Sequence, residues 1–285
     1  MINRRDILKL AAAGGAVGAL GAIAGCERPQ SGGAAPGESP EASAAAPGPA
    51  TSPDPSIGVR RADDRGTSDR GWLKARFSFS FSDYADPRWS SFGPLRVINE
   101  DRIASQGGFP LHPHRNMEII TYVLEGALEH KDTLGNSGTI EPGQVQYMSA
   151  GQGVRHSEFN TSSDTTHLYQ IWLTPSQDGG APAYGSRHFG DERHGGLRLI
   201  ASPAGREGSI AIRQDADLHA AILKPGDEIL HALAPGRRFW LQVARGALRL
   251  NGHHLLTGDG AFSIDTPGLE IQALEGCELL LFDMA

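Results

Sequence analysis

The chain has 285 residues and a mass of 30.3 kDa, a length that suits one large or two small domains. Its residues are 39% hydrophobic and 21% charged, a composition that excludes wholesale disorder. The net charge of −7 and the lack of a clustered basic face argue against nucleic acid as a partner, and two cysteines are too few for a disulfide framework.

Residues 1–26 are predicted to be an export signal of the lipoprotein type. Residues 3–9 resemble the twin-arginine motif, and the apolar run over 10–24 is short for a membrane-spanning helix. Residues 23–26 resemble a bacterial lipobox in which Cys26 is the lipidated residue. A plain N-terminal transmembrane anchor is the alternative, but the paired arginines and the position of Cys26 favour a periplasmic or envelope-anchored lipoprotein, held at a membrane by its lipid.

Residues 27–57 are rich in proline, glycine, alanine and serine and contain almost no large apolar side chains. Such a segment buries too little surface to offset the entropy lost on ordering it. We therefore predict a flexible tether that holds the folded part away from the membrane surface.

Strand patterns dominate the chain from residue 57 onward. Residues 76–81 alternate apolar and polar side chains, as in a half-buried strand. Residues 119–124 are β-branched and aromatic before a Glu-Gly turn, while 138–140 and 168–173 also have strand character. No long helical periodicity interrupts these segments, so the sequence predicts an all-β sandwich or barrel.

The second half of the chain repeats this pattern. Residues 220–223, 238–245 and 258–262 are predicted strands with turns at similar spacing, and the turns at 141–144 and 224–227 look like counterparts. This weak internal repeat indicates two barrels derived from one duplicated ancestor. We therefore predict an N-terminal domain over 58–180 and a C-terminal domain over 181–285.

Four residues in the first predicted barrel have the spacing of metal ligands. His112 and His114 lie two residues apart, as do His156 and Glu158, and residues i and i+2 of a strand point to the same face. Three imidazoles and one carboxylate suit iron, manganese, nickel, copper or zinc. The alternative is a set of surface or packing histidines, but four residues in two matched pairs favour one metal site.

Two related segments also carry a family resemblance. Residues 107–126 and 142–160 resemble the paired motifs of the cupin superfamily, with His112-Pro113-His114 in the first and His156-Ser157-Glu158 in the second. The residues at 108–115 and 148–158 are more specifically similar to those of the pirin family, in particular its bacterial quercetin 2,3-dioxygenases. The resemblance runs from about Val59 to the C-terminus and omits the signal and the tether.

The resemblance implies a bicupin fold, with two jelly-roll-like barrels in one chain and one divalent transition metal in the first. It assigns the ligand roles to His112, His114, His156 and Glu158, with iron as the expected metal. Many cupins use the glutamate of the first motif instead, which nominates Glu118. We favour Glu158, because the two residues of the His-x-Glu pair share a strand face.

The second barrel lacks such a constellation. His231 stands alone in the sequence, and the adjacent His253 and His254 would point to opposite faces of a strand. We therefore expect a C-terminal cupin domain without a metal site. Cys277, unpaired once Cys26 is lipidated, is predicted to be a buried apolar-like residue.

The resemblance further implies a dioxygenase that opens flavonol-type, quercetin-like rings with O₂. Its metal would act as a Lewis acid toward the substrate oxygen, and Glu158 would be both a ligand and the catalytic proton acceptor. Four apolar residues are candidates either for the pocket or for the core: Phe79, Phe109, Tyr122 and Met148.

Two other functions stay open at this stage. One is a non-catalytic metal-binding protein that acts as an envelope redox sensor or a protein-interaction module, and the other is a cupin that acts on another small molecule. An enzyme requires an open pocket with apolar walls that leads to the metal, whereas a sensor does not. In each case we expect a monomer.

Overall fold

The computed structural model describes residues 52–285. The predicted signal, Cys26 and most of the predicted tether lie outside the described residues. Within residues 52–285, no helix is long and apolar enough to cross a membrane. The helices of this part are single 3₁₀ turns, namely η2 (Ala62–Asp64), η3 (Pro87–Trp89), η4 (Gly190–Arg193) and η5 (Arg206–Gly208). The prediction of an all-β fold is confirmed.

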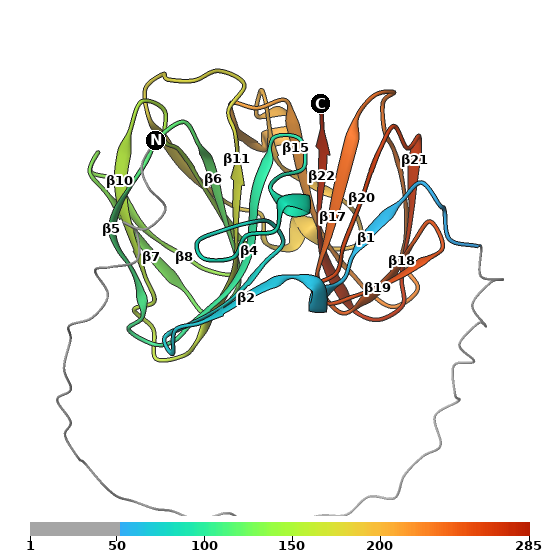
Figure 1. Ribbon diagram of the computed structural model, residues 1–285, viewed down its shortest axis with the longest axis horizontal. Coiled ribbons are helices and arrows are strands. Elements are labelled where there is room, and N and C mark those ends of the chain that lie inside the picture. Colours follow the sequence, from blue (N-terminus) through green and yellow to red (C-terminus); the bar gives the residue numbers. More distant parts are fainter. Residues whose placement is uncertain (1–51) are drawn as a thin grey trace, which may run out of the picture.

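Two β-barrels lie side by side, each built from a seven-stranded and a four-stranded sheet (Figure 1). In the N-terminal barrel the strand orders are β12-β9-β6-β11-β4-β3-β2 and β5-β10-β7-β8. The strands of this barrel are β2 (Gly66–Asp69), β3 (Leu73–Phe77), β4 (Leu95–Ile103), β5 (Gly108–His114), β6 (Glu118–Glu125), β7 (Leu128–Asp132), β8 (Ser137–Ile140), β9 (Gln144–Ser149), β10 (Val154–Phe159), β11 (Thr166–Leu173) and β12 (Ala183–His188).

The C-terminal barrel has the same composition of sheets. Its strand orders are β1-β20-β17-β22-β15-β13-β14 and β16-β21-β18-β19. The strands of this barrel are β1 (Gly58–Arg60), β13 (Arg198–Ser202), β14 (Ile210–Ala211), β15 (Ala216–Leu223), β16 (Glu228–Ala232), β17 (Arg238–Arg245), β18 (Ala247–Leu250), β19 (His253–Leu256), β20 (Gly260–Ile264), β21 (Gly268–Ala273) and β22 (Cys277–Met284).

Two strands cross between the barrels near the predicted domain limits. β1 pairs with β20 of the C-terminal barrel, with Gly58 opposite Phe262. β12 pairs with β9 of the N-terminal barrel, with Ala183 opposite Ser149. The division into 58–180 and 181–285 stays a prediction, and the pairing adds that a strand from each side joins the other barrel. A strand's own sequence does not specify such a distant partner.

The predicted strand over 76–81 differs in extent from the structure. β3 begins at Leu73 and ends at Phe77. Beyond it, the Ser78 N–H still donates to Ile98 O, but the Ser80 N–H donates to Trp89 O in the neighbouring loop. The apolar-polar alternation therefore continues past the end of the strand, because these side chains pack in a loop that has left the ladder.

Strands at the centre of the molecule are buried on both faces. Every residue of β22 is buried: Leu279 and Leu281 pack inside the C-terminal barrel, while Leu280 and Phe282 pack against the other barrel. Cys277 also lies in the barrel core, as predicted. Continuous apolar runs such as this one arise when both faces of a sheet are covered.

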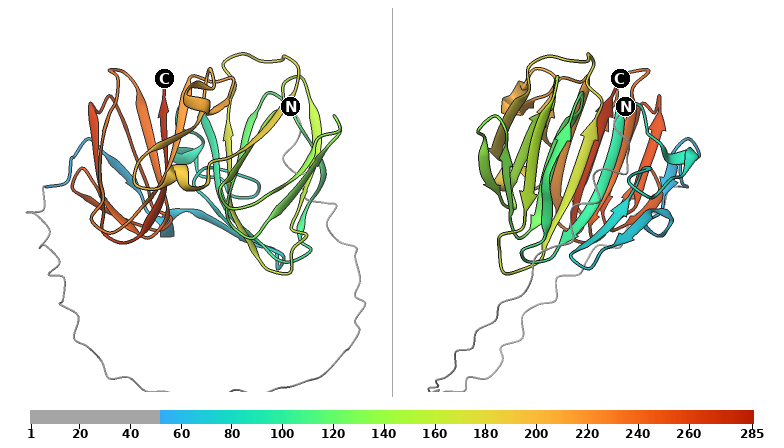
Figure 2. Two further views of the ribbon diagram at one scale, coloured as in Figure 1. Left: turned by 180° about the vertical axis from the view of Figure 1, so that it is seen from behind. Right: turned by 60° about the vertical axis from the view of Figure 1, so that its left-hand side comes forward.

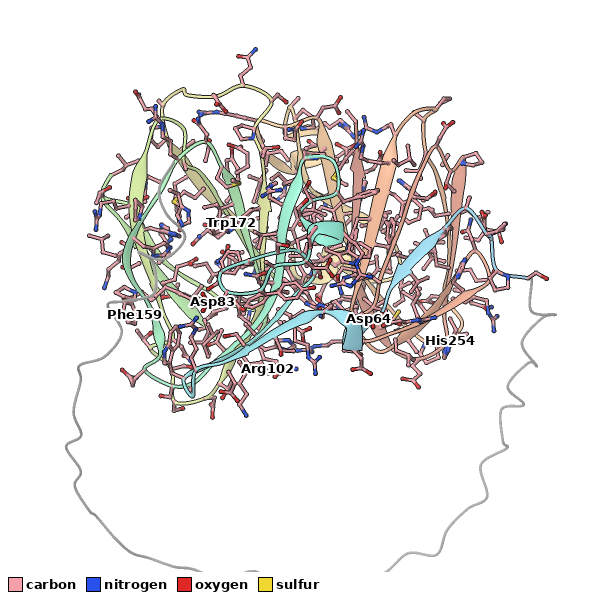
Figure 3. All side chains as sticks on the ribbon, viewed as in Figure 1. Asp64, Asp83, Arg102, Phe159, Trp172 and His254 are labelled. Atoms are coloured by element: carbon pink, nitrogen blue, oxygen red, sulfur yellow. The ribbon has the colours of Figure 1, made fainter. Side chains whose placement is uncertain are left out.

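The two seven-stranded sheets share one apolar core, which joins the barrels (Figures 1 and 2). Phe79 lies with its ring centroid 4.9 Å from that of Trp240, and Trp240 stacks on Phe262 at 5.4 Å. Side chains fill both barrels and the space between them (Figure 3). Burial of aromatic surface on this scale makes a rigid, obligate interface.

A buried ion pair closes one side of this interface. The Tyr122 hydroxyl donates to Glu278 Oε1 at 2.6 Å, and Arg193 Nη1 lies 3.0 Å from the same oxygen. The Arg193 and Glu278 side chains are only 8% and 10% exposed. Removing one partner would leave the other charge buried without compensation.

We therefore predict that Arg193→Met lowers the free energy of unfolding by about 3 kcal/mol. The control is Arg88→Met, since Arg88 is 81% exposed in its pair with Asp86 and its loss should cost much less stability. Denaturant titration of both variants measures the difference. Equal effects would show that the buried pair contributes no more than a surface pair.

Candidate metal centre

The antiparallel pairing of β5 with β10 brings the two sequence motifs together. His112 lies opposite His156, and His114 lies opposite Val154. The register shifts between His156 and Glu158, which marks a bulge. Gly108 permits this approach: a Cβ there would lie 2.4 Å from the carbonyl oxygen of Glu158. The strands can therefore meet this closely only where one of them has no side chain.

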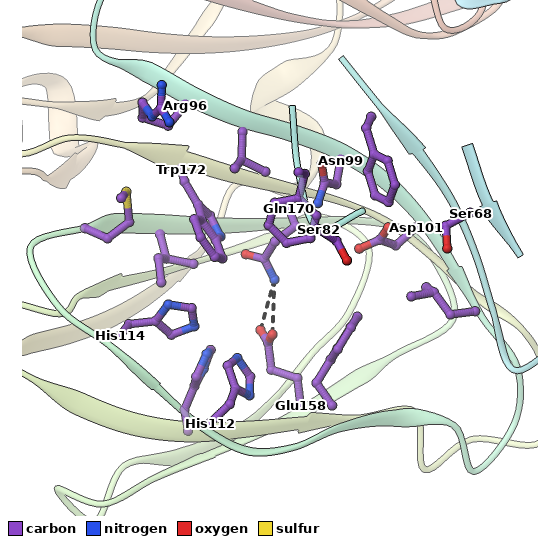
Figure 4. A pocket seen from close by; sticks show the side chains of 18 of the residues that line it. Ser68, Ser82, Arg96, Asn99, Asp101, His112, His114, Glu158, Gln170 and Trp172 are labelled. Atoms are coloured by element: carbon purple, nitrogen blue, oxygen red, sulfur yellow. Dashed lines mark hydrogen bonds between the residues drawn. The ribbon is translucent and has the colours of Figure 1, made fainter. Parts of the chain in front are cut away.

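Three imidazoles form a triangle inside the N-terminal barrel (Figure 4). Ring centroids are 4.4 Å apart for His112 and His156, 4.8 Å for His112 and His114, and 4.8 Å for His114 and His156. One ring nitrogen from each lies within 4.8 Å of the others. This arrangement could hold a metal ion on one side of the triangle.

Hydrogen bonds fix which ring nitrogen of each histidine is free. His112 Nδ1 lies 2.8 Å from Pro110 O, which can only accept, so Nδ1 carries the proton and Nε2 keeps its lone pair. His156 Nδ1 lies 3.3 Å from His130 Nδ1, and Gln146 Nε2 donates to that same His130 nitrogen at 3.4 Å. His130 Nδ1 is therefore an acceptor, and His156 donates through Nδ1 and keeps the Nε2 lone pair.

Burial keeps His114 and His156 neutral. It lowers the pKa of His156 to about 2, with the neighbouring His112 and His130 adding to the effect. Burial, followed by His156 and His112, also holds the pKa of His114 well below its ordinary value. A neutral imidazole is the form that binds a metal, so the folded protein presents the triangle ready for a cation.

Glu158 lies beside the triangle and is 3% exposed. Its carboxylate accepts hydrogen bonds from Gln170 Nε2 at 3.1 and 3.2 Å, and one oxygen lies 3.5 Å from Thr121 Oγ1. A carboxylate oxygen lies within 4.8 Å of ring nitrogens of His156 and His130. No lysine or arginine in the described part of the chain forms an ion pair with it, so its donors are neutral.

These features fit a bound cation. His156 Nε2 is buried and makes no hydrogen bond within residues 52–285. Glu158 is a buried carboxylate without a cationic partner, a situation that is costly unless a positive charge is nearby. Nitrogen and oxygen ligands together suit a divalent transition metal.

Glu118, the alternative ligand, is occupied elsewhere. It is fully buried and accepts hydrogen bonds from Ser149 Oγ at 2.6 Å, from the Tyr147 hydroxyl and from the Arg213 backbone N–H at 2.9 Å. It belongs to neither cluster of metal-ligating atoms around His156. Its carboxylate instead ties β6 to the C-terminal half of the chain.

A pocket of about 280 Å³ opens onto the histidine triangle. Phe81, Phe109, Met117, Ile119 and Trp172 give it apolar walls. Of the four apolar candidates in the sequence, only Phe109 lines the pocket; the other three are core residues, namely Phe79, Tyr122 and Met148. Sequence reasoning missed Trp172, although its position in the strand pattern two residues beyond Gln170 places it on the same face.

The far end of the pocket is polar. Ser82, Asn99 and Asp101 line it opposite the histidines (Figure 4). Burial raises the pKa of Asp101 to about 7, and the nearby Glu158 and Glu100 carboxylates add to the rise. The sequence pattern did not single them out as site residues; the structure does, with Asn99 and Asp101 on β4 and Ser82 in the loop after β3.

In the C-terminal barrel, His231 has a histidine neighbour. Its ring centroid lies 5.2 Å from that of His219, because β15 and β16 face each other across the barrel. Two imidazoles are fewer than the three groups found around His156. Within residues 52–285, each cluster of three or more close metal-ligating residues includes His156.

Comparison with known families agrees with this architecture. Residues 58–173 match the pirin family, and residues 199–284 match the quercetinase C-terminal cupin domain. Residues 1–21 match the twin-arginine translocation signal sequence, which supports twin-arginine export.

The chain aligns with nearly the full length of several known proteins. A quercetin 2,3-dioxygenase of Escherichia coli is 43% identical over 229 residues, which is 80% of this chain and 98% of the relative. A pirin-like protein of Caulobacter vibrioides is 45% identical over 225 residues, 78% and 97% of the two chains. The structure of the bacterial pirin YhhW from Escherichia coli in complex with nickel(II) matches with a TM-score of 0.77 and 43% identity, covering 80% and 98%.

The fold and the cluster of histidines define a bicupin with a candidate metal centre in its first barrel. The chain belongs to the pirin family.

The lowered histidine pKa values predict acid sensitivity of the metal-free protein. As the pH falls below about 6.5, the unfolded chain protonates His156 while the folded protein does not, so each pH unit costs about 1.4 kcal/mol of stability for this group. Over pH 4 to 6 in the presence of a chelator, His156→Asn should flatten the fall of the unfolding free energy by about that slope. Asp101 acts with the opposite sign, because its raised pKa favours the folded state as the pH falls, but it is common to both proteins and cancels.

The matched control is His194→Asn, since His194, the residue that follows η4, is half exposed. It should keep the wild-type slope. Identical slopes for His156→Asn and the wild type would mean that His156 is protonated in the folded protein.

Proposed function

We propose that this pirin is a metal-dependent dioxygenase that cleaves flavonol-type substrates with O₂. The observation that carries the proposal is the pocket, which leads between apolar walls to three clustered imidazoles and a buried carboxylate. A relative at 43% identity is named a quercetin 2,3-dioxygenase. The proposal makes the protein an oxidoreductase.

One divalent transition metal is the proposed cofactor, held by His112, His114, His156 and Glu158. Glu158 lies close to His156 on β10 and would supply the carboxylate oxygen. Iron is our first assignment, although nickel is the metal in the solved relative; manganese, copper and zinc suit the same donors. When bound, the metal supplies Lewis acidity toward a substrate enol or phenol oxygen.

We assign Glu158 a second role, as acceptor of the substrate hydroxyl proton. Both of its oxygens accept from the Gln170 amide, which holds the carboxylate toward the pocket. A carboxylate within reach of a bound hydroxyl group can accept its proton. Phe109 and Trp172 enclose the same space and exclude water from it.

An open pocket favours this enzyme over a redox sensor with a closed site. An envelope redox sensor, a protein-interaction module and a cupin for another small molecule are the alternatives that a failed assay would support. Because the walls are mainly apolar, an aromatic substrate suits them better than a sugar or a keto acid.

We further propose that the exported protein is a monomer anchored by lipid on Cys26, with the segment after it as a tether. This predicts that Cys26→Ser moves the protein from the membrane fraction to the soluble periplasmic fraction and abolishes labelling with a radioactive fatty acid. Fractionation of cells that express each form measures both effects. Retention of the Cys26→Ser protein in membranes would favour an uncleaved transmembrane anchor.

The reaction is tested by metal analysis and O₂ uptake with quercetin, using the chain from Glu27 onward. We expect about one metal per chain in the wild type and, for His114→Ala, at least a tenfold loss of metal affinity and of O₂ uptake. His194→Ala is the control and should match the wild type. Bound metal without uptake across flavonols would turn the assignment toward the sensor or another substrate, and absence of metal would remove the proposed centre.

A further inference from the structure

The polar end of the pocket contains atoms that have no hydrogen-bond partner. Asn99 Oδ1, Asp101 Oδ1 and Ser82 Oγ are buried and unpaired within the described part of the chain. Asn99 and Asp101 are 2% and 3% exposed, and both line the pocket. Figure 4 shows these three residues across the pocket from His112 and His114.

Such atoms are costly to bury without a partner. The fold of β4 does not depend on these polar atoms, because Leu95 and Ile98 anchor the strand in the apolar core between the barrels. Asn99 and Asp101 are two residues apart and share the other face of the strand, inside the barrel. Something that enters the pocket is therefore expected to satisfy them.

The chemistry of the partner follows from the atoms. The amide oxygen of Asn99 accepts hydrogen bonds, and so does the ionised Asp101 carboxylate, which can also donate when it is protonated; the Ser82 hydroxyl can take either role. Asn99 and Asp101 are neighbours on one strand face, so together they call for a ligand group that can both donate and accept. Neutral hydroxyl groups meet this requirement in an otherwise apolar pocket.

The space between the two ends is shaped for a flat body. The Trp172 ring packs edge-on against two other rings: its centroid lies 4.8 Å from that of His114 and 5.5 Å from that of Phe81. It therefore forms a continuous aromatic wall from the histidine triangle toward the polar end. An aromatic ligand can lie along this wall with one oxygen at the triangle and further hydroxyls at Asn99 and Asp101.

We propose that Asn99 and Asp101, aided by Ser82, form a hydroxyl-binding subsite that selects ligands with ring hydroxyls remote from the metal-binding oxygen. This inference rests on the proposed function, which it deepens by naming the residues that distinguish flavonols by the hydroxyls on their rings. A ligand without those hydroxyls leaves the subsite atoms unpaired and is rejected.

The test compares quercetin with 3-hydroxyflavone, which keeps the metal-binding oxygens but lacks the ring hydroxyls. Anaerobic binding is measured by calorimetry on the full, metal-loaded protein, and O₂ uptake is measured separately. We expect the wild type to bind quercetin about 100-fold more tightly. Asn99→Leu and Asp101→Leu should each reduce that preference at least tenfold, while 3-hydroxyflavone affinity changes less than about threefold.

Two further variants separate recognition from folding. Asp101→Asn keeps an accepting oxygen and should retain most of the preference. Because the Asp101 carboxylate lacks a partner, Asp101→Leu should keep or raise the Tm, whereas a purely structural carboxylate would lower it. Asp191→Leu, at a fully exposed site on η4, is the control and should leave both affinities unchanged.

The outcomes distinguish this subsite from the reaction. Preferential quercetin binding that is lost in the leucine variants, without O₂ uptake, would support the subsite and remove the proposed reaction. O₂ uptake with equal affinity for both flavonols, or a preference that survives both leucine substitutions, would overturn the subsite and leave the reaction standing. Failure of both flavonols to bind would overturn the subsite.

Discussion

The antiparallel pairing of β5 with β10 sets His112 opposite His156, and the candidate centre depends on that register. Side chains alternate between the two faces of a strand, so a slip of one residue would turn His112 and His114 out of the barrel together. Gly108 allows the strands to approach at the point where the register shifts. Burial of this strand pair then lowers the pKa values of His114 and His156 and keeps both imidazoles neutral, so strand packing contributes directly to the site's chemistry.

The second barrel supports the first through buried contacts that carry no metal chemistry. Glu118 on β6 accepts the Arg213 backbone N–H, and Glu278 on β22 receives both Tyr122 and Arg193. These polar contacts border the shared apolar core that joins the barrels. β6 carries Glu118 at one end and borders the pocket through Ile119, so docking of the barrels also holds a wall of the pocket in place.

A buried carboxylate lies at each end of the pocket. Glu158 and Asp101 are both buried and form no ion pair within residues 52–285, and each lies near the other. Two uncompensated carboxylates in one barrel are unfavourable unless a cation or a proton relieves them. The imidazole triangle can attract the cation to the Glu158 end, while Asp101 faces a region where hydroxyl donors would fit.

The sequence by itself determined what local periodicity can encode: the strands, the shared face of His112 and His114, and the twin-arginine signal. Periodicity of two says which side chains share a face, but it does not say which distant strand lies opposite. Only the tertiary structure shows which groups surround each carboxylate: Glu118 is hydrogen-bonded by Tyr147, Ser149 and the Arg213 backbone, whereas Glu158 lies beside His156. The tertiary structure also placed Asn99 in the pocket, and it paired β1 with the C-terminal barrel and β12 with the N-terminal barrel. Long-range packing makes these contacts, so neighbouring residues do not encode them.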